Sequence, residues 1–301
     1  MKKLLFVYNP LSGKGQIASY LSDIIDVFVK NEYEVTVYPT QSRGYAKKLV
    51  SDVGSNYDMI VCSGGDGTLN ETISGMMTLS EKPTLGYIPA GSTNDFAQSI
   101  KLSKDMVESA NMAMEGMPIA VDIGSFNKKN FVYVAAFGTF TNVSYATPQD
   151  MKNVLGHSAY VVEAVKELAS IQSYHLRVKH NNGIEEGEYI YGMISNSISV
   201  GGLKGITGKN IVLDDGLFEM TLVKKPKNPL DLNLIIGNLL GIDVKSDCVT
   251  TVKASKIRIE STEKIPWVLD GEFGGDLKKV NIENNKRAIK IMSGITKTKT
   301  N

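Results

Sequence analysis

Three loops rich in glycine and small polar residues follow apolar runs in the first third of the chain. Their sequences are Asn-Pro-Leu-Ser-Gly-Lys-Gly at residues 9–15, Ser-Gly-Gly-Asp-Gly-Thr at 63–68 and Pro-Ala-Gly-Ser-Thr-Asn-Asp at 89–95. Each precedes a helical pattern, so each would place backbone N–H groups at a helix start, where they can bind a phosphate. The three loops therefore predict nucleotide binding, and phosphoryl transfer is the chemistry that such a site serves.

The first loop fits two phosphate-binding patterns only in part. It lacks the upstream glycine of a P-loop, and Lys14 is followed by Gly15 instead of Ser or Thr. It also contains Gly13-x-Gly15-x-x-Ala18, a variant of the dinucleotide-binding pattern that is weak alone. The alternative interpretation is a tight turn that needs small residues, with Ser12 as a helix cap.

The second loop places one carboxylate, that of Asp66, among three glycines. A carboxylate beside a phosphate is unfavourable unless a cation lies between them, so the loop predicts Mg²⁺ together with a nucleotide. The alternative is a tight strand-to-helix turn. The spacing Thr68-x-x-Glu71 predicts a capping box for the following helix. In the third loop, the polar residues at 92–95 exceed what one helix cap needs, so we expect some of them to face the site.

Apolar periodicity predicts the elements that position these loops. Short apolar runs predict buried strands, and spacings of three and four predict helices. The predicted strands are residues 4–8, 35–38, 59–62 and 85–88. The predicted helices are residues 17–28, 45–53, 69–77, 95–100 and 104–115. Alternating strands and helices predict a doubly wound, mostly parallel sheet, in which ligands bind beyond the carboxyl ends of the strands.

The pattern changes after about residue 121. Short strand-like runs dominate, Asn181-Asn182-Gly183 is a turn signal between two of them, and one helix is predicted at 158–169. The predicted strands are residues 131–136, 176–180, 189–194, 218–223, 256–259, 267–269, 280–282 and 289–292. We therefore expect a first domain at 1–125 and an antiparallel β domain at 126–301, whose last strand can pack back on the first. Trp267 is expected in the core.

Composition excludes several classes of protein. With 33 Lys plus Arg against 32 Asp plus Glu, the net charge of +1 argues against a nucleic-acid binder. Two cysteines, Cys62 and Cys248, are too few for a secreted disulfide scaffold and favour a cytosolic chain with reduced thiols. No apolar run reaches the roughly 20 residues that a membrane span needs. Any attraction to a membrane must then come from a local patch, such as the lysines at 224–227, or from apolar surface.

The ordered motifs resemble the soluble bacterial diacylglycerol kinase family. The resemblance rests on the three loops and extends over essentially the whole chain through Val121-Asp122-Ile-Gly124, Asp214-Asp215-Gly216-Leu217-Phe218 and Asp270-Gly271-Glu272-Phe273. It implies an NAD-kinase-like nucleotide-binding domain followed by a mostly antiparallel β-sandwich, with ATP and Mg²⁺ in the cleft between them. The implied reaction transfers the γ-phosphate of ATP to the hydroxyl of diacylglycerol or a related membrane lipid and gives phosphatidic acid.

The resemblance also implies roles for single residues. Asp66 would face the catalytic magnesium, Asp95 and Asp122 would join it in a carboxylate–water–metal network, and Glu272 would be the general base. A second, structural Mg²⁺ would be held by Asp215 and the backbone carbonyls of Val212 and Leu217, with Asp214 as a rival ligand. The implied nucleotide contacts are Asn9, Pro10, Leu11, Ser12, Gly13, Thr40, Gly65, Asp66, Gly67, Thr68, Leu69, Asn70, Glu71 and Ser92.

Three other functions stay open at this point. The chain could be an NAD kinase-like enzyme that acts on a soluble substrate, because Gly-Gly-Asp-Gly-Thr is shared with that family. It could be a dinucleotide-binding oxidoreductase, with Glu34 about 20 residues after the first loop. It could also be a nucleotide sensor without turnover. The resemblance favours a cytoplasmic enzyme with transient peripheral membrane contact, no nucleic-acid partner and a possible homodimer, and the sequence does not identify the lipid.

Overall fold

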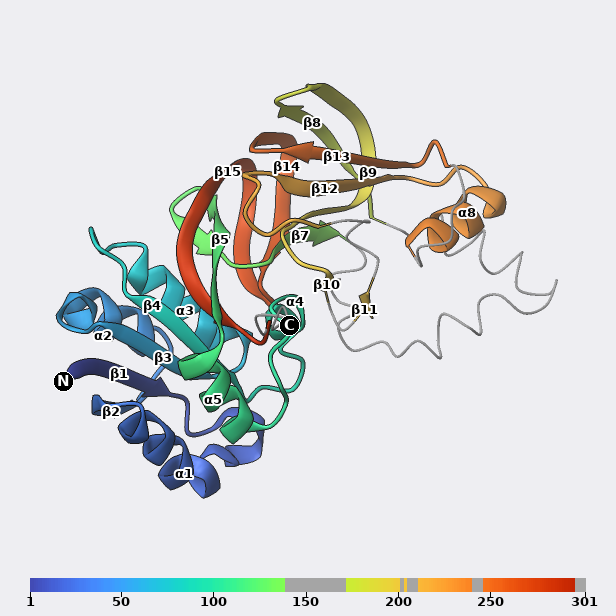
Figure 1. Ribbon diagram of the computed structural model, residues 1–301. Helices are drawn as coiled ribbons and strands as arrows, with labels where there is room; N and C mark the ends of the chain where they lie inside the picture. Colours follow the sequence, from blue (N-terminus) through green and yellow to red (C-terminus); the bar gives the residue numbers. More distant parts are fainter. Residues whose placement is uncertain (139–171, 201–202, 205–210, 240–245, 296–301) are drawn as a thin grey trace, which may run out of the picture.

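The computed structural model describes residues 1–138, 172–200, 203–204, 211–239 and 246–295 (Figure 1). The helices, including two short 3₁₀ segments, are η1 (Ser12–Gly15), α1 (Ile17–Lys30), α2 (Tyr45–Val53), η2 (Gly54–Asn56), α3 (Asp66–Met76), α4 (Asp95–Ser99), α5 (Met106–Glu115) and α8 (Pro229–Leu239). The strands are β1 (Lys2–Tyr8), β2 (Tyr33–Pro39), β3 (Met59–Gly64), β4 (Thr84–Pro89), β5 (Met117–Phe126), β6 (Lys129–Phe131), β7 (Val134–Gly138), β8 (Tyr174–His180), β9 (Gly183–Ser195), β10 (Ser199–Val200), β11 (Leu203–Lys204), β12 (Phe218–Lys224), β13 (Val249–Ala254), β14 (Lys256–Leu269) and β15 (Glu272–Ser293).

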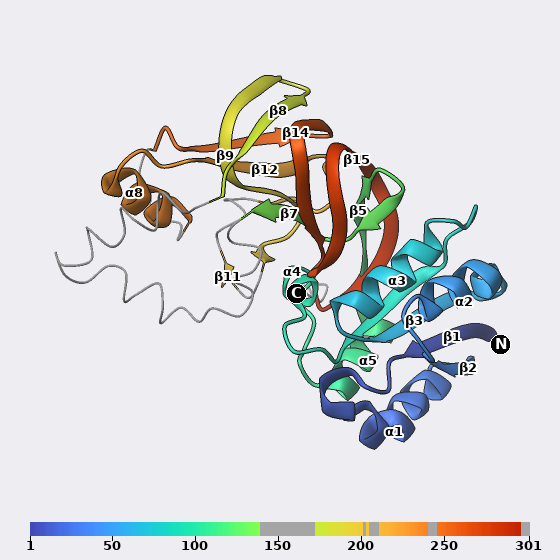
Figure 2. The same cartoon turned by 180° about the vertical axis from the view of Figure 1, so that it is seen from behind.

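The first part of the chain forms the predicted doubly wound α/β unit. Strands β4, β3, β1 and β2 lie side by side in that order, and all three pairings are parallel. Successive side chains of a strand face opposite sides of the sheet. In β1, Phe6 accordingly packs in the core with residues of α1 and α5, whereas Leu5 packs in the core with residues of α2 and α3. Helices α1 and α5 thus lie on one face of the sheet, and α2 and α3 lie on the other (Figures 1 and 2). The predicted fold class and its helices and strands are confirmed here.

The second part is mostly antiparallel and has its own apolar core. The fully buried Trp267 lies 4.9 Å from the ring of Phe137 and 5.0 Å from that of Phe126, both in edge-to-face geometry. The predicted turn joins β8 to β9, where His180 pairs with Gly183 across Asn181 and Asn182. The expectation that the tryptophan is a core residue is therefore confirmed.

One long strand, β15, connects the two parts. It pairs antiparallel with β14 and β5, and near its end Ile291 lies opposite Leu85 of β4 in a parallel pairing (Figure 1). The sequence predicted two separate short strands at 280–282 and 289–292. They are one strand because the polar residues between them keep the extended backbone, which contains a register shift between Asn285 and Ile289.

Some predicted and observed elements differ. Strands β5, β10, β11 and β13 and helix α8 were not predicted. The strand predicted at 131–136 is divided between β6 and β7, whereas the segments 256–259 and 267–269 belong to a single strand, β14. The helix predicted at 158–169 lies outside the described residues. Across the ranges that the structure describes, no helix is long and apolar enough to span a membrane.

Candidate active site

The loops that follow the parallel strands meet at one edge of the sheet, as the strand order requires. The backbone N–H of Asn9 donates to the carbonyl of Ser63 at 2.9 Å, and that of Ala90 donates to the carbonyl of Gly64 at 2.8 Å. The loop after β1 is thus tied to the end of β3, and the end of β3 is tied to the loop after β4. The three glycine-containing loops form one continuous surface.

Two glycines are needed because these loops pack against each other. A Cβ on Gly13, whose φ is +55°, would lie 2.1 Å from the carbonyl oxygen of Ala90. A Cβ on Gly91 would lie 2.6 Å from the Cα of Gly65. Part of the glycine pattern is therefore explained by packing between loops, whatever the site binds.

A cavity of about 350 Å³ opens beside the first two of these loops and the segment that follows β2, and no residue of the loop after β4 lines it. Residues of the loops after β1, β2 and β3 and of α3 form most of its wall, and Glu272, the first residue of β15, contributes from the other side. The lining residues are Asn9, Leu11, Ser12, Thr40, Gln41, Ser42, Arg43, Gly65, Gly67, Thr68, Glu71 and Glu272. Many of the residues predicted to contact the nucleotide thus line one cavity.

Asp66 is the first residue of α3, and its carboxylate is buried beside the start of α4. One oxygen, Oδ2, accepts a hydrogen bond from the backbone N–H of Asp95 at 3.2 Å, whereas the buried Oδ1 has no partner among the described residues. Burial, and to a smaller extent the nearby charges of Asp95 and Asp270, raise the pKa of Asp66 to about 6, although the backbone N–H groups of Asp95 and Phe96 act in the opposite direction. Asp95 is itself 2% exposed, and its Oδ1 accepts from the hydroxyl of Ser199 at 2.9 Å. The site therefore holds a desolvated carboxylate with one free lone-pair face.

The predicted capping box at Thr68 and Glu71 is wrong. Helix α3 begins at Asp66, two residues before Thr68, so both residues lie inside the helix. The Glu71 carboxylate instead accepts from the backbone N–H groups of Gly44, at 2.6 Å, and Ala46, at 3.2 Å. Since Gly44 is the N-cap residue of α2, Glu71 of one helix caps the start of another.

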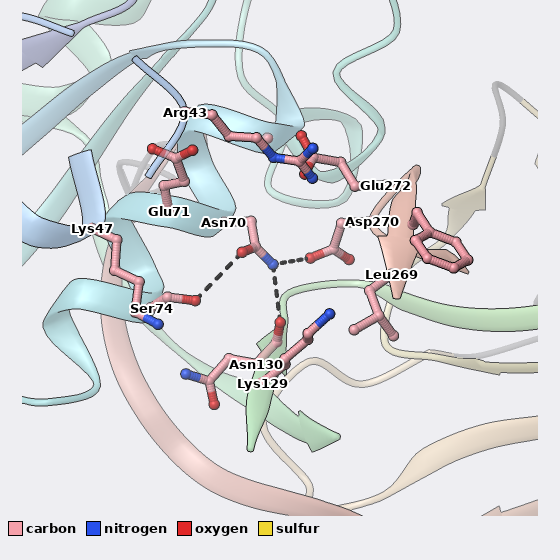
Figure 3. A pocket seen from close by; sticks show the side chains of 12 residues that line it. Arg43, Lys47, Asn70, Glu71, Ser74, Lys129, Asn130, Leu269, Asp270 and Glu272 are labelled. Atoms are coloured by element: carbon pink, nitrogen blue, oxygen red, sulfur yellow. Dashed lines mark hydrogen bonds and ion pairs between the residues drawn. The ribbon is translucent and has the colours of Figure 1, made fainter. Parts of the chain in front are cut away.

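Asp270, the first residue of the Asp-Gly-Glu-Phe motif, is a buried anchor, a role that the sequence did not assign to it. Its carboxylate accepts hydrogen bonds from the backbone N–H groups of three consecutive residues, at 2.7 Å (Val132), 3.0 Å (Tyr133) and 3.0 Å (Val134). The amide of Asn70 on α3 donates to the same carboxylate at 2.6 Å (Figure 3). Burial nevertheless raises its pKa. Asp270 thus ties the first helix of the site to the β part of the molecule, two residues before Glu272.

Glu272 faces the loops from the other side of the cleft. Its carboxylate accepts a hydrogen bond from the guanidinium of Arg43, which lies between β2 and α2 (Figure 3). Both residues line the larger cavity and also a second one of about 230 Å³, whose wall includes Asn70, Lys129 and Phe273. The ion pair therefore lies where the two cavities adjoin.

Comparisons with known proteins identify the family. The model of the diacylglycerol kinase catalytic domain matches residues 3–126, and the model of the YegS C-terminal NAD kinase beta sandwich-like domain matches residues 134–293. A diacylglycerol kinase of Staphylococcus aureus (strain MRSA252) is 32% identical over 97% of this chain and 92% of its own length. One of Bacillus subtilis (strain 168) is 29% identical over 92% of both. The chain belongs to the bacterial diacylglycerol kinase family.

A solved structure agrees with this fold. A diacylglycerol kinase from Bacillus anthracis str. Sterne has a TM-score of 0.76 to this kinase and covers 97% of each chain, at 22% sequence identity. At that identity the likeness shows the fold alone. The predicted α/β domain followed by a β-sandwich is confirmed, and so is the assignment of the chain to a family of lipid kinase enzymes.

In this kinase the remaining predicted residues are spread over a wider region. Asp122 is fully buried, and its carboxylate accepts from the backbone N–H of Gly216 (2.7 Å), the backbone N–H of Arg287 (2.7 Å) and the amide of Asn284 (3.1 Å). It therefore anchors the loop before β12 to β15. The two carboxylates that act on Asp66 electrostatically are those of Asp95 and Asp270.

The two acidic residues proposed for a structural metal have different partners. Asp214 accepts from the guanidinium of Arg287 at 3.0 Å. Asp215 accepts from the backbone N–H of Leu217 at 2.9 Å and lies 3.6 Å from the ammonium of Lys253. Val212 is exposed. Across the described part of the chain, no three His, Cys, Asp or Glu side chains converge as direct ligands of one metal ion.

Six of the predicted nucleotide contacts do not line the larger cavity: Pro10, Gly13, Asp66, Leu69, Asn70 and Ser92. The Leu69 side chain is fully buried in the core beneath α3, so only its backbone could take part in binding. Ser92 is exposed on the third loop. That loop is closed by Asn94, whose side chain accepts from the N–H of Gly91 at 2.9 Å and donates to its carbonyl at 2.7 Å.

Proposed function

We propose that this chain is an ATP-dependent kinase that transfers the γ-phosphate of ATP to the hydroxyl of diacylglycerol or a related membrane lipid. The observation that carries the proposal is the larger cavity at the strand ends, lined by Gly65 and Gly67, the neighbours of Asp66, whose own carboxylate is desolvated. Relatives named diacylglycerol kinase that cover nearly the whole chain support the same reaction. Phosphoryl transfer depends on positioning and on cancelling charge, and the loops offer backbone N–H groups for both.

The Asp66 carboxylate fits a divalent cation. Its Oδ1 atom is buried and has no hydrogen-bond partner among the described residues, and oxygen ligands are those that Mg²⁺ prefers. Since no cluster of three such side chains converges in the described ranges, a bound Mg²⁺ would keep waters and phosphate oxygens as its other ligands. When bound there, the ion would neutralise charge on the transferred phosphoryl group.

Glu272 is the proposed general base. An alcohol becomes a nucleophile as it loses its proton, and an ionised carboxylate within hydrogen-bond reach of the hydroxyl can accept that proton. Glu272 suits this role because its carboxylate is half-exposed at the border of two cavities, and because the buried Asp270 anchors the turn that carries it. Asp95 supports the site by holding α4 beside Asp66.

A structural Mg²⁺ at the loop 212–217 stays a prediction. Asp215 is the better candidate of the two acidic residues, because Asp214 is paired with Arg287. The ammonium of Lys253, which is 3.6 Å from Asp215 and 2.9 Å from Glu219, would compete with an ion there. Contact with a membrane also stays a proposal; the exposed Lys227 and the 66%-exposed Leu230 at the start of α8 support it.

A lipid-panel assay tests the proposed reaction. The chain is incubated with γ-labelled ATP, Mg²⁺ and mixed vesicles that contain diacylglycerol, ceramide or other hydroxylated lipids, and each product is identified by mass. Label in phosphatidic acid supports the proposal. Label that stays in an aqueous product such as a phosphorylated dinucleotide would favour the NAD kinase-like function, and ATP binding without any product would favour a sensor.

A further inference from the structure

An ion pair bridges the cleft at the candidate active site. The Nη2 group of Arg43, in the segment between β2 and α2, donates to Oε2 of Glu272 at the start of β15. The two side chains are 74% and 50% exposed. The pair therefore joins the loop side of the cleft to the turn that carries the proposed base, although 229 positions separate the residues in the sequence.

Stability does not explain this pair well. An exposed ion pair contributes only about 0–1 kcal/mol to folding. The chain offers a matched case in Arg258 and Glu260, which lie 2.7 Å apart on β14 with exposed fractions of 57% and 33%. Neither of these residues lines the two cavities, whereas Arg43 and Glu272 line both. The location of the Arg43 pair is what distinguishes it.

The charged side chains that line the larger cavity suggest a second role for Arg43, in nucleotide binding. Among the side chains that line this cavity, Arg43 is the cation, and Glu71 and Glu272 are the carboxylates. Glu71 is engaged by the N–H groups at the start of α2, and Glu272 is engaged by Arg43 itself. Without the guanidinium, two carboxylates would face any bound polyphosphate and repel it.

We propose that Arg43 is a positioning residue that couples nucleotide binding to the general base. A guanidinium has five N–H donors in a planar fork, so Arg43 can hold the Glu272 carboxylate with one arm and donate to a phosphate oxygen with the other. The proposal rests on the proposed function, in which a nucleotide fills the larger cavity. The motif pattern did not reveal Arg43, because it lies outside the glycine loops.

The experiment compares Arg43→Gln, Arg43→Lys and Glu272→Gln with the matched control Arg258→Gln, each first checked for an unchanged melting temperature. The affinity for Mg²⁺-ATP is measured by calorimetry, and turnover is measured with diacylglycerol vesicles. We expect Arg43→Gln to weaken ATP binding about tenfold and to lower kcat about tenfold. Arg43→Lys keeps the positive charge without the fork, so it should restore most of the affinity but not kcat. Arg258→Gln should change neither quantity.

A double variant separates coupling from two independent effects. If Arg43 acts through Glu272, the variant Arg43→Gln/Glu272→Gln should have the same kcat as Glu272→Gln alone. The proposal would be overturned if the kcat of the double variant fell by the product of the two single effects. It would also be overturned if Arg43→Gln stayed within twofold of Arg258→Gln in both ATP affinity and kcat. If no lipid is phosphorylated by the unaltered chain, the proposed function fails, while the calorimetric comparison still decides whether Arg43 binds the nucleotide.

Discussion

The cleft has two carboxylates that could take part in the reaction, and their surroundings are opposite. Asp66 lies on the loop side, buried at the start of α3, with one oxygen unpartnered in the described structure and a pKa raised to about 6. Glu272 lies on the turn side, half-exposed and paired with Arg43. A buried carboxylate without a counter-charge is costly unless it protonates or meets a cation. Glu272, in contrast, is open to water and has a guanidinium as its counter-charge.

This difference assigns the two groups to different tasks. Asp66 gains most from a bound cation, because the ion replaces both the lost water and the missing partner. Glu272 can accept a proton and return it to solvent, because water reaches it. Asp270 fixes the turn that precedes Glu272. Its carboxylate accepts four hydrogen bonds, more than the structure gives to Asp66 or to Glu272.

The largest expected effect follows from removing the charge of Asp66. Asp66→Asn keeps the size of the side chain and its hydrogen bond from Asp95, but it loses the cation ligand. We expect kcat with diacylglycerol to fall about 10³-fold, because a metal ion stabilises phosphoryl charge by several kcal/mol. Steady-state kinetics across Mg²⁺ concentrations checks this, with the exposed Asp23→Asn as the control. Turnover within tenfold of the unaltered chain would contradict the role of Asp66.

The same substitution should increase stability. The folded-state pKa of Asp66 lies above its ordinary value of 3.8, so its contribution to stability is complete below about pH 4 and is lost as the pH rises through about 6. In the presence of a chelator at pH 7.5, we expect Asp66→Asn to raise the free energy of unfolding by about 1–3 kcal/mol. At pH 4 the gain should disappear. Urea unfolding at both values tests this, and an equal gain at both would exclude the ionisation of Asp66 as its cause.

Removal of Asp270, the anchor of the turn side, should lower the stability of the fold. Asp270→Ala leaves three backbone N–H groups and the Asn70 amide without their acceptor in a buried place. We expect the free energy of unfolding to fall by about 3 kcal/mol. Urea unfolding measures it, and Asp270→Asn, which keeps one acceptor oxygen, should lose less. A change below about 0.5 kcal/mol in the alanine variant would show that these bonds are replaced by solvent.

Glu272 itself should affect the reaction and leave the fold intact. Glu272→Gln removes the proton acceptor but keeps the shape of the side chain, so we expect kcat to fall about 10²-fold, a typical contribution of general base catalysis. The free energy of unfolding should change by less than about 1 kcal/mol, since the pair with Arg43 is exposed. Full turnover with normal ATP affinity would contradict the assignment of Glu272 as the general base.

The loop side of the cleft was the more predictable half. Its strands carry uninterrupted apolar runs, and its glycine loops follow them directly, so the meeting of the loops at one sheet edge follows from parallel strand order alone. Roles for single residues were harder even there. The spacing of Thr68 and Glu71 matched a capping box, yet the carboxylate caps a different helix, because the structure brings α2 beside α3.

The turn side could not be derived from local patterns. The pairings of Asn70 with Asp270 and of Arg43 with Glu272 join residues 200 and 229 positions apart, and no periodicity encodes such contacts. The long strand β15 was missed for a related reason. Its middle, residues 283–287, is a run of polar residues, which predicts a loop. This segment is extended because the strand pairs with β5 and β14. Contacts between residues far apart in the sequence thus determine the turn side of the site, which local secondary-structure propensity does not predict.

The smallest effect concerns Glu71, which has two roles on the loop side because it lines the cavity and caps α2. Glu71→Ala removes the acceptor for the first N–H groups of α2, so we expect the free energy of unfolding to fall by about 1 kcal/mol. The exposed Glu81→Ala should leave it unchanged. Calorimetric ATP affinity then separates the two roles. If the carboxylate serves only the helix, affinity stays within about threefold; a larger loss would mean that it also contacts the nucleotide, as the family resemblance implies.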